Sequence, residues 1–224
     1  MKNGGSAPHT EEVQRFFKHE VKSRGWYTPE IRKLARRFTK VLKNDAGLPY
    51  LVEVAHLLFQ GEVLEEKILA VFLLERETGE FGDREFRLFE EWLPRISSWA
   101  DHDGLVYYLI SPMVVGNAER QERAFQWALS NDRWYRRAAA VSLVRAARAK
   151  QSFPQIQRTT EVLLADRDDM VQKGLGWLLR EAAKADPKTT VPYLMKIRGR
   201  APRLVLRTAC EKLTPAQRAR ILET

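Results

Sequence analysis

The chain has 224 residues, of which 44% are hydrophobic, and it carries a formal net charge of +9. This length is enough for a sizeable core, and no apolar run reaches the roughly 18 residues of a membrane span. The one cysteine, Cys210, excludes an internal disulfide and a zinc site built from cysteines, which suits a reducing cytoplasm. The composition therefore predicts a basic cytoplasmic protein without a membrane partner. Its charge favours an anionic partner, with nucleic acid as the first candidate.

The N-terminal residues predict a short disordered leader over 1–9, because they are polar and lack the apolar core of a signal peptide. From residue 10 onward the pattern is helical, with no strand-like alternation beyond a few residues. Asp83 is expected to cap a helix, and Pro112, which falls inside an expected helix, predicts a kink. The expected helices cover 10–24, 28–43, 49–59, 62–77, 83–96, 101–115, 118–129, 133–150, 154–164, 169–185, 187–197, 202–213 and 215–222.

An internal repeat runs through these helices. One position recurs near the start of the second helix of five successive pairs, at intervals of 36, 34, 36 and 34 residues. Stacked helix pairs of this period resemble HEAT repeats, so we expect an all-α superhelical solenoid that forms a single domain over 10–224. The cations at this position would follow a phosphate backbone along the concave face. The five residues are Lys67, Asp103, Arg137, Lys173 and Arg207.

Asp103 is the one member of this column with a negative charge. It ends the stretch Trp99-Ala-Asp101-His102-Asp103, which crowds two carboxylates, a histidine and a tryptophan into five residues. A carboxylate among phosphate-binding cations weakens DNA affinity, so Asp103 needs another role. Both aspartates are also candidate helix N-caps, and Trp99 taken alone is expected in the core. His102 has no His or Glu three or four residues later, so we expect a surface histidine and no metal site.

Two later helices carry arginines and tryptophans that are candidates for DNA contacts. Arg136 and Arg137 are adjacent, so one should face the groove, and the repeat favours Arg137. Trp134 occupies an apolar position of the repeat and is expected in the core. Trp177 lies one turn after Lys173 on the same face. It is either a core residue or an exposed indole that packs on sugar or base.

Several classes of enzyme site are absent from the sequence. There is no Gly-rich phosphate loop, no Ser/His/Asp or Cys/His nucleophile pattern and no H-E-x-x-H motif. The H-x-E and P-C-x-x-C motifs of zinc deaminases are also missing. We therefore expect neither a metal ion nor a cofactor.

Four motifs resemble the AlkD-type alkylpurine DNA glycosylases, also called DNA alkylation repair enzymes. The likeness runs from about residue 12 to 213, and the third motif is the most specific. The motifs are Thr28-Pro-Glu30, Trp99-x-x-x-Asp103, Gln172-Lys-Gly-Leu-Gly-Trp177-Leu-Leu-Arg180-Glu and Trp134-Tyr-Arg136-Arg137-Ala-Ala.

The resemblance implies a superhelix of HEAT-like repeats that excises cationic N3- and N7-alkylated purines from duplex DNA. The N-glycosidic bond is hydrolysed without enclosing the base in a flipped-out pocket. Asp103 would stabilise the oxocarbenium-like sugar and position the attacking water. Trp99 and Trp177 would pack against the deoxyribose of the lesion, and Arg137 would hold a flanking phosphate. Further DNA contacts are expected from Lys67, Lys173, Arg180, Arg207 and Phe16.

The sequence departs from the family pattern at three points. Ala100 follows Trp99 where the family has an aromatic or an acid, so Asp101 and Asp103 both remain candidates for the functional acid, although the repeat favours Asp103. Phe16 matches a DNA-contacting tyrosine of the family but lacks its hydroxyl. We also expect the family's opening helix to be missing.

Two alternatives remain open beside a monomeric glycosylase. One is a non-catalytic HEAT-like DNA-binding protein that senses lesions or structure. The other is a protein-binding scaffold, which is the commonest use of such repeats.

Overall fold

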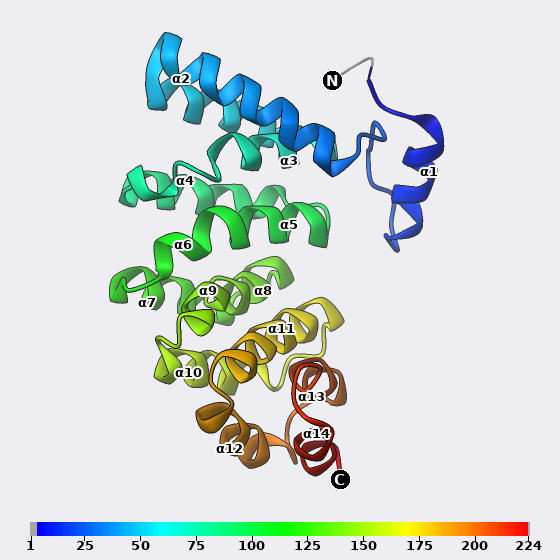
Figure 1. The fold of residues 1–224 in the computed structure, drawn as a ribbon, viewed down its shortest axis with the longest axis vertical. Coiled ribbons are helices and arrows are strands. Elements are labelled where there is room, and N and C mark those ends of the chain that lie inside the picture. The colour runs from blue at the N-terminus through cyan, green and yellow to red at the C-terminus, as the bar shows by residue number, and fades with distance from the viewer. Residues whose placement is uncertain (1–3, 224) are drawn as a thin grey trace. The chain divides into compact units, whose positions relative to one another are not determined.

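The computed structural model describes residues 4–223, and within that range the chain is helical with no strand (Figure 1). The prediction of an all-α fold is therefore confirmed. The chain divides into two compact units, Met1–Leu109 and Ile110–Thr224. Within each unit the helices pack on others that lie close by in the chain, which is compatible with HEAT-like repeats. The single repeat domain over 10–224 stays a prediction.

The first unit is centred on the packing of α3 against α2, and α3 also packs against α5 (Figure 1). Most of α3 is apolar on all sides, as expected for a helix buried between neighbours. No helix among the described residues is long and apolar enough to cross a bilayer. The helices of this unit are α1 (Ala7–Arg15), α2 (Thr28–Phe59), α3 (Leu64–Leu74), the 3-10 helix η1 (Thr78–Glu80), α4 (Asp83–Trp92), the 3-10 helix η2 (Leu93–Arg95) and α5 (Trp99–Leu105).

The N-terminal segment differs from the sequence-based expectation. Residues 7–9, expected in a disordered leader, form the first turn of α1, where Pro8 suits the helical backbone angle. Residues 1–3 of that leader lie outside the described residues. The helix ends at Arg15 instead of residue 24, because the following segment is held in a non-helical form by Glu65 of α3.

Glu65 is 2% exposed, and its carboxylate accepts hydrogen bonds from the backbone N–H groups of Arg24 (2.9 Å), Gly25 (2.9 Å) and Trp26 (3.3 Å). The hydroxyl of Ser23 donates a further bond at 2.5 Å. A buried carboxylate is stable only when such donors surround it. The loop that precedes α2 is therefore shaped by a residue about forty positions later in the chain.

A bend at Gly47 divides α2 into two arms. Gly47 has φ 80° and ψ 176° inside the helix, and Pro49 follows it. A positive φ is accessible to glycine without steric cost, and proline provides no N–H for the preceding turn. The two helices expected over 28–43 and 49–59 are thus present as two arms of one kinked element.

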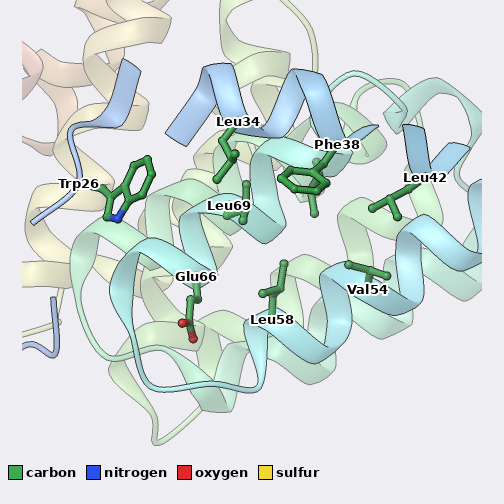
Figure 2. A pocket seen from close by; sticks show the side chains of 9 residues that line it. Trp26, Leu34, Phe38, Leu42, Val54, Leu58, Glu66 and Leu69 are labelled. Atoms are coloured by element: carbon green, nitrogen blue, oxygen red, sulfur yellow. The ribbon is translucent and has the colours of Figure 1, made fainter. Parts of the chain in front are cut away.

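The arms of α2 and helix α3 line an open apolar pocket of about 420 Å³ (Figure 2). Leu34 and Phe38 enter it from the first arm, Leu58 enters it from the second, and Leu69 enters it from α3. Glu66 is the charged residue at its edge, and this carboxylate is bonded to Arg24 at 2.8 Å.

Two local predictions for the middle of the chain are modified by the structure. The N-cap of α4 is Gly82, whose N–H is bound by the Glu85 carboxylate at 2.9 Å, and Asp83 is the first helical residue instead of the cap. The kink expected from Pro112 is a π-helix, η3 (Val106–Ile110), directly before α6 (Ser111–Val114). Proline cannot donate to the carbonyl four residues earlier and its ring crowds that carbonyl, which favours a wider turn.

In the second unit α11 packs against α8, α9 and α13 (Figure 1). Two glycines allow this close approach. A Cβ on Gly176 would lie 2.7 Å from the Cβ of Thr208 on α13, and one on Gly174 would lie 3.0 Å from the Cγ of Arg137 on α8. The helices of this unit are α6, α7 (Ala118–Gln126), the 3-10 helix η4 (Trp127–Leu129), α8 (Arg133–Val141), α9 (Val144–Arg148), α10 (Phe153–Leu163), α11 (Asp169–Ala185), α12 (Pro187–Ile197), α13 (Arg203–Ala209) and α14 (Pro215–Leu222).

Candidate functional site

The start of α5 is fixed by Asp101. Its carboxylate accepts the backbone N–H groups of Ser97 (2.8 Å) and Ser98 (2.7 Å) and both of their hydroxyls (3.0 and 2.6 Å). Ser98 is the N-cap residue and Asp101 the third helical residue, so the pair forms a capping box. Asp101 is 1% exposed. Its role is therefore to hold the helix, which leaves Asp103 as the candidate functional acid.

Lys67 completes this anchor from α3. Its ammonium lies 3.2 Å from the Asp101 carboxylate, also donates to the carbonyl of Arg95, and the residue is 2% exposed. A buried ammonium needs such partners, and here the packing of α3 on α5 provides them. Lys67 was expected to contact DNA, but its ammonium is buried and bonded within the protein. The proposed DNA interface therefore does not include it.

Asp103 retains 22% of its side-chain exposure, and its Oδ1 lies 2.8 Å from Nδ1 of His102. His102 is fully buried, so the expectation of a surface histidine is wrong. The helix explains the difference, because Ser98, His102 and Leu105 share the inner face of α5 at spacings of three and four residues. Periodicity alone did not identify this face in so short and polar a stretch.

Trp99 is 40% exposed, so the expectation that it belongs to the core is wrong. Its ring lies against that of Phe17, with centroids 5.5 Å apart and planes tilted by 32°. Nearby, Nε2 of His19 lies 2.6 Å from the carbonyl oxygen of Ser97. Phe16, expected at the DNA, is 73% exposed and is a neighbour in sequence of the ring that meets Trp99. The sequence does not indicate which of the two adjacent phenylalanines lies against Trp99, because this depends on the conformation of the loop after α1.

Trp99 and Asp103 therefore form the exposed part of the candidate site in the first unit. They are four residues apart on α5, which places the indole and the carboxylate on one face of the helix. A partly exposed carboxylate beside an apolar ring suits a cationic substrate. The charge attracts it, and the ring displaces water from one side.

In the second unit, the side chain of Arg137 on α8 packs against α11. Its Nη1 donates to the carbonyl of Met170 at 2.5 Å, and the residue is 5% exposed. Little of its surface is therefore presented to a phosphate. Arg136 is held as well, with Nε 2.6 Å from the Asp166 carboxylate. Trp134 is 8% exposed, which agrees with its expected place in the core.

The other sequence candidates of this unit are more accessible. Lys173 is exposed on α11 with only a 3.4 Å ion pair to Asp169, and Trp177 is half-buried one turn later. Arg180 follows on the same face, and its Nη1 is bound to the Glu211 carboxylate at 2.6 Å. Arg207 is exposed on α13. In this unit Lys173 and Arg207 are therefore exposed, whereas Arg136 and Arg180 are bound to carboxylates at 2.6 Å.

Comparisons with known proteins agree with this architecture. A search of curated proteins finds no match. A solved structure described as a predicted DNA alkylation repair enzyme from Enterococcus faecalis is similar, with a TM-score of 0.82 and 19% sequence identity. The alignment covers 96% of this chain and 100% of that one, and at this identity it supports the fold alone. Residues 1–213 match the family described as DNA alkylation repair enzyme. The chain therefore belongs to the DNA alkylation repair enzyme family, which gives it a role in the repair of alkylated DNA.

Proposed function

We propose that the protein is a DNA glycosylase that removes cationic N3- and N7-alkylated purines from duplex DNA. The observation that supports this most directly is the pairing of Asp103 with Trp99 on one exposed face of α5. The second carboxylate of the stretch, Asp101, is fully engaged in holding the helix. One acid is thus left for chemistry beside an indole that can pack on a sugar.

The proposed reaction needs only one carboxylate because the substrate base already carries a positive charge. The bond between C1′ and the base breaks, and its electron pair neutralises the departing purine. Positive charge develops on the sugar, where the negative Asp103 stabilises it electrostatically. A water oxygen then bonds to C1′, and its proton passes to the carboxylate and on to solvent. Trp99 packs against the deoxyribose and limits access of other water to it.

For DNA binding, the proposal relies on the exposed groups of the second unit. Lys173 and Arg207 are accessible cations that suit phosphate contacts, and Trp177, which is half-buried, would pack on a sugar. Arg180 would have to leave Glu211 to reach a phosphate, and Phe16 offers an exposed ring. A cytoplasmic monomer is the form that we propose to be active.

The test is release of 7-methylguanine and 3-methyladenine from methylated duplex DNA, measured by mass spectrometry. We expect release by the wild type, and a loss of roughly 100-fold to 1,000-fold in Asp103→Asn, typical of removing a preorganised electrostatic group. Asp45→Asn, which removes an exposed carboxylate near the bend of α2, is the charge-matched control and should behave as wild type.

Equal release by the wild type and Asp103→Asn would remove Asp103 from the mechanism. If no protein releases base but the duplex is bound, the function is that of a non-catalytic DNA-binding protein.

A further inference from the structure

The mechanism above does not use His102, although it lies directly beside the functional acid. The ring is fully buried, and its Nδ1 is 2.8 Å from Oδ1 of Asp103. The proposed mechanism uses Asp103 in its ionised form, which can only accept hydrogen bonds, and with that form Nδ1 carries the proton and donates it. A leucine would fill a buried position without the cost of desolvating an imidazole. The polar ring therefore calls for an explanation beyond packing.

The orientation of the Asp103 carboxylate provides that explanation. The terminal torsion of an aspartate side chain is broad, so a partly exposed carboxylate samples many orientations unless a partner restrains it. His102 is a suitable restraint because its burial prevents the ring from moving. The helix that carries both residues is itself anchored, since Asp101 accepts bonds from Ser97 and Ser98 and pairs with Lys67.

We propose that His102 is a positioning residue for Asp103. It binds Oδ1 and thereby sets the plane of the carboxylate, so that Oδ2 is directed to the sugar and to the attacking water. This proposal rests on the proposed glycosylase function. Its chemistry requires only a fixed donor at Nδ1, because no proton passes between the two side chains during the reaction.

Two substitutions separate this role from packing. His102→Leu fills the buried space without a donor, whereas His102→Asn places an amide N–H close to the position of Nδ1. The measurements are the single-turnover rate of base release from methylated duplex DNA, the dissociation constant for the same duplex and the thermal midpoint. We expect His102→Leu to slow release roughly 10-fold to 100-fold, the effect of losing a hydrogen bond to a charged group. The dissociation constant should stay within about twofold, and His102→Asn should recover most of the rate.

The same substitution is then made in the Asp103→Asn background. If His102 acts through Asp103, His102→Leu should cause no further loss there. An equal loss in both backgrounds would overturn the proposal, as would a fully active His102→Leu or a His102→Asn as slow as His102→Leu.

A second measurement is independent of activity. The nitrogen resonances of the His102 ring should show a protonated Nδ1 in the wild type, and this resonance should shift in Asp103→Asn. An unprotonated Nδ1 would overturn the positioning role even in an active enzyme. A wild type that releases no base would instead defeat the proposed function, and the positioning role would fall with it. An active wild type with an equally active His102→Leu would defeat only the positioning role.

Discussion

The two units differ in how far the cations at the same repeat position are covered. In the first unit Lys67 is 2% exposed and pairs with Asp101. In the second unit Arg137 is also buried, whereas Lys173 and Arg207 at the matching positions are exposed. The first unit thus uses its cation to hold the helix that carries Asp103. The second leaves cations accessible to a polyanion. A repeated residue type therefore does not imply a repeated role, because the neighbouring helix decides whether the side chain is covered.

The tryptophans give the largest expected contrast between the units. Trp134 of the second unit is 8% exposed, so Trp134→Ala should reduce the free energy of unfolding by about 3–5 kcal/mol. Trp99 of the first unit is 40% exposed, so Trp99→Ala should cost less than about 1.5 kcal/mol but slow base release about tenfold. Urea unfolding and the release assay together measure both effects. The contrast fails if Trp99→Ala destabilises the protein as much as Trp134→Ala does.

The two lysines at the repeat position, Lys67 and Lys173, should differ in their effect on stability. Lys67→Met leaves the Asp101 carboxylate without its cation in a buried site and should cost about 3 kcal/mol. Lys173→Met, the matched change at an exposed position, should stay within about 0.5 kcal/mol of wild type. The comparison uses urea unfolding at neutral pH. Similar losses in both variants would show that burial does not distinguish the two positions.

Two helical glycines test how closely the helices of each unit approach. A Cβ on Gly176 would meet Thr208 at 2.7 Å, so Gly176→Ala should destabilise the protein by about 1–3 kcal/mol. The control is Gly104 on α5, where the nearest atom to an added Cβ is on Val71 at 3.8 Å. Gly104→Ala should be neutral or should stabilise by up to about 1 kcal/mol, because alanine favours the helix. Thermal unfolding of both variants is sufficient, and a stable Gly176→Ala would contradict the close approach of α11 and α13.

Much of the fold could be predicted because local signals and tertiary packing agree. Prolines at the starts of α12 and α14 and the apolar period of α11 give helices whose bounds match the expected 187–197, 215–222 and 169–185. The prediction fails in the loop after α1, where the conformation depends on hydrogen bonds to Glu65. No local pattern reports a donor and an acceptor that are forty residues apart.

For the candidate site, the sequence singles out Asp103 as a candidate acid but does not reveal which side chains surround it. The repeat spacing separates Asp103 from Asp101, because only Asp103 shares a position with the cations of the repeat, and the structure adds that Asp101 is buried. Burial of Lys67 and His102 was missed, since it depends on which face of α5 meets α3. Phe17 was missed for a similar reason, because a loop places its ring against Trp99.

The smallest expected effect concerns DNA binding by the exposed cations of the second unit. Each phosphate contact releases counterions, so removing one should lower the slope of log affinity against log salt by about 0.9. Lys173→Gln and Arg207→Gln should each show this change in fluorescence anisotropy with a duplex, with little change in stability. Lys188→Gln is the matched control. Lys188 is exposed on α12, but it does not occupy the repeat position. A slope that falls equally in all three variants would indicate diffuse attraction to a basic protein. A fall confined to Lys173→Gln and Arg207→Gln would assign phosphate contacts to these two exposed cations of the second unit.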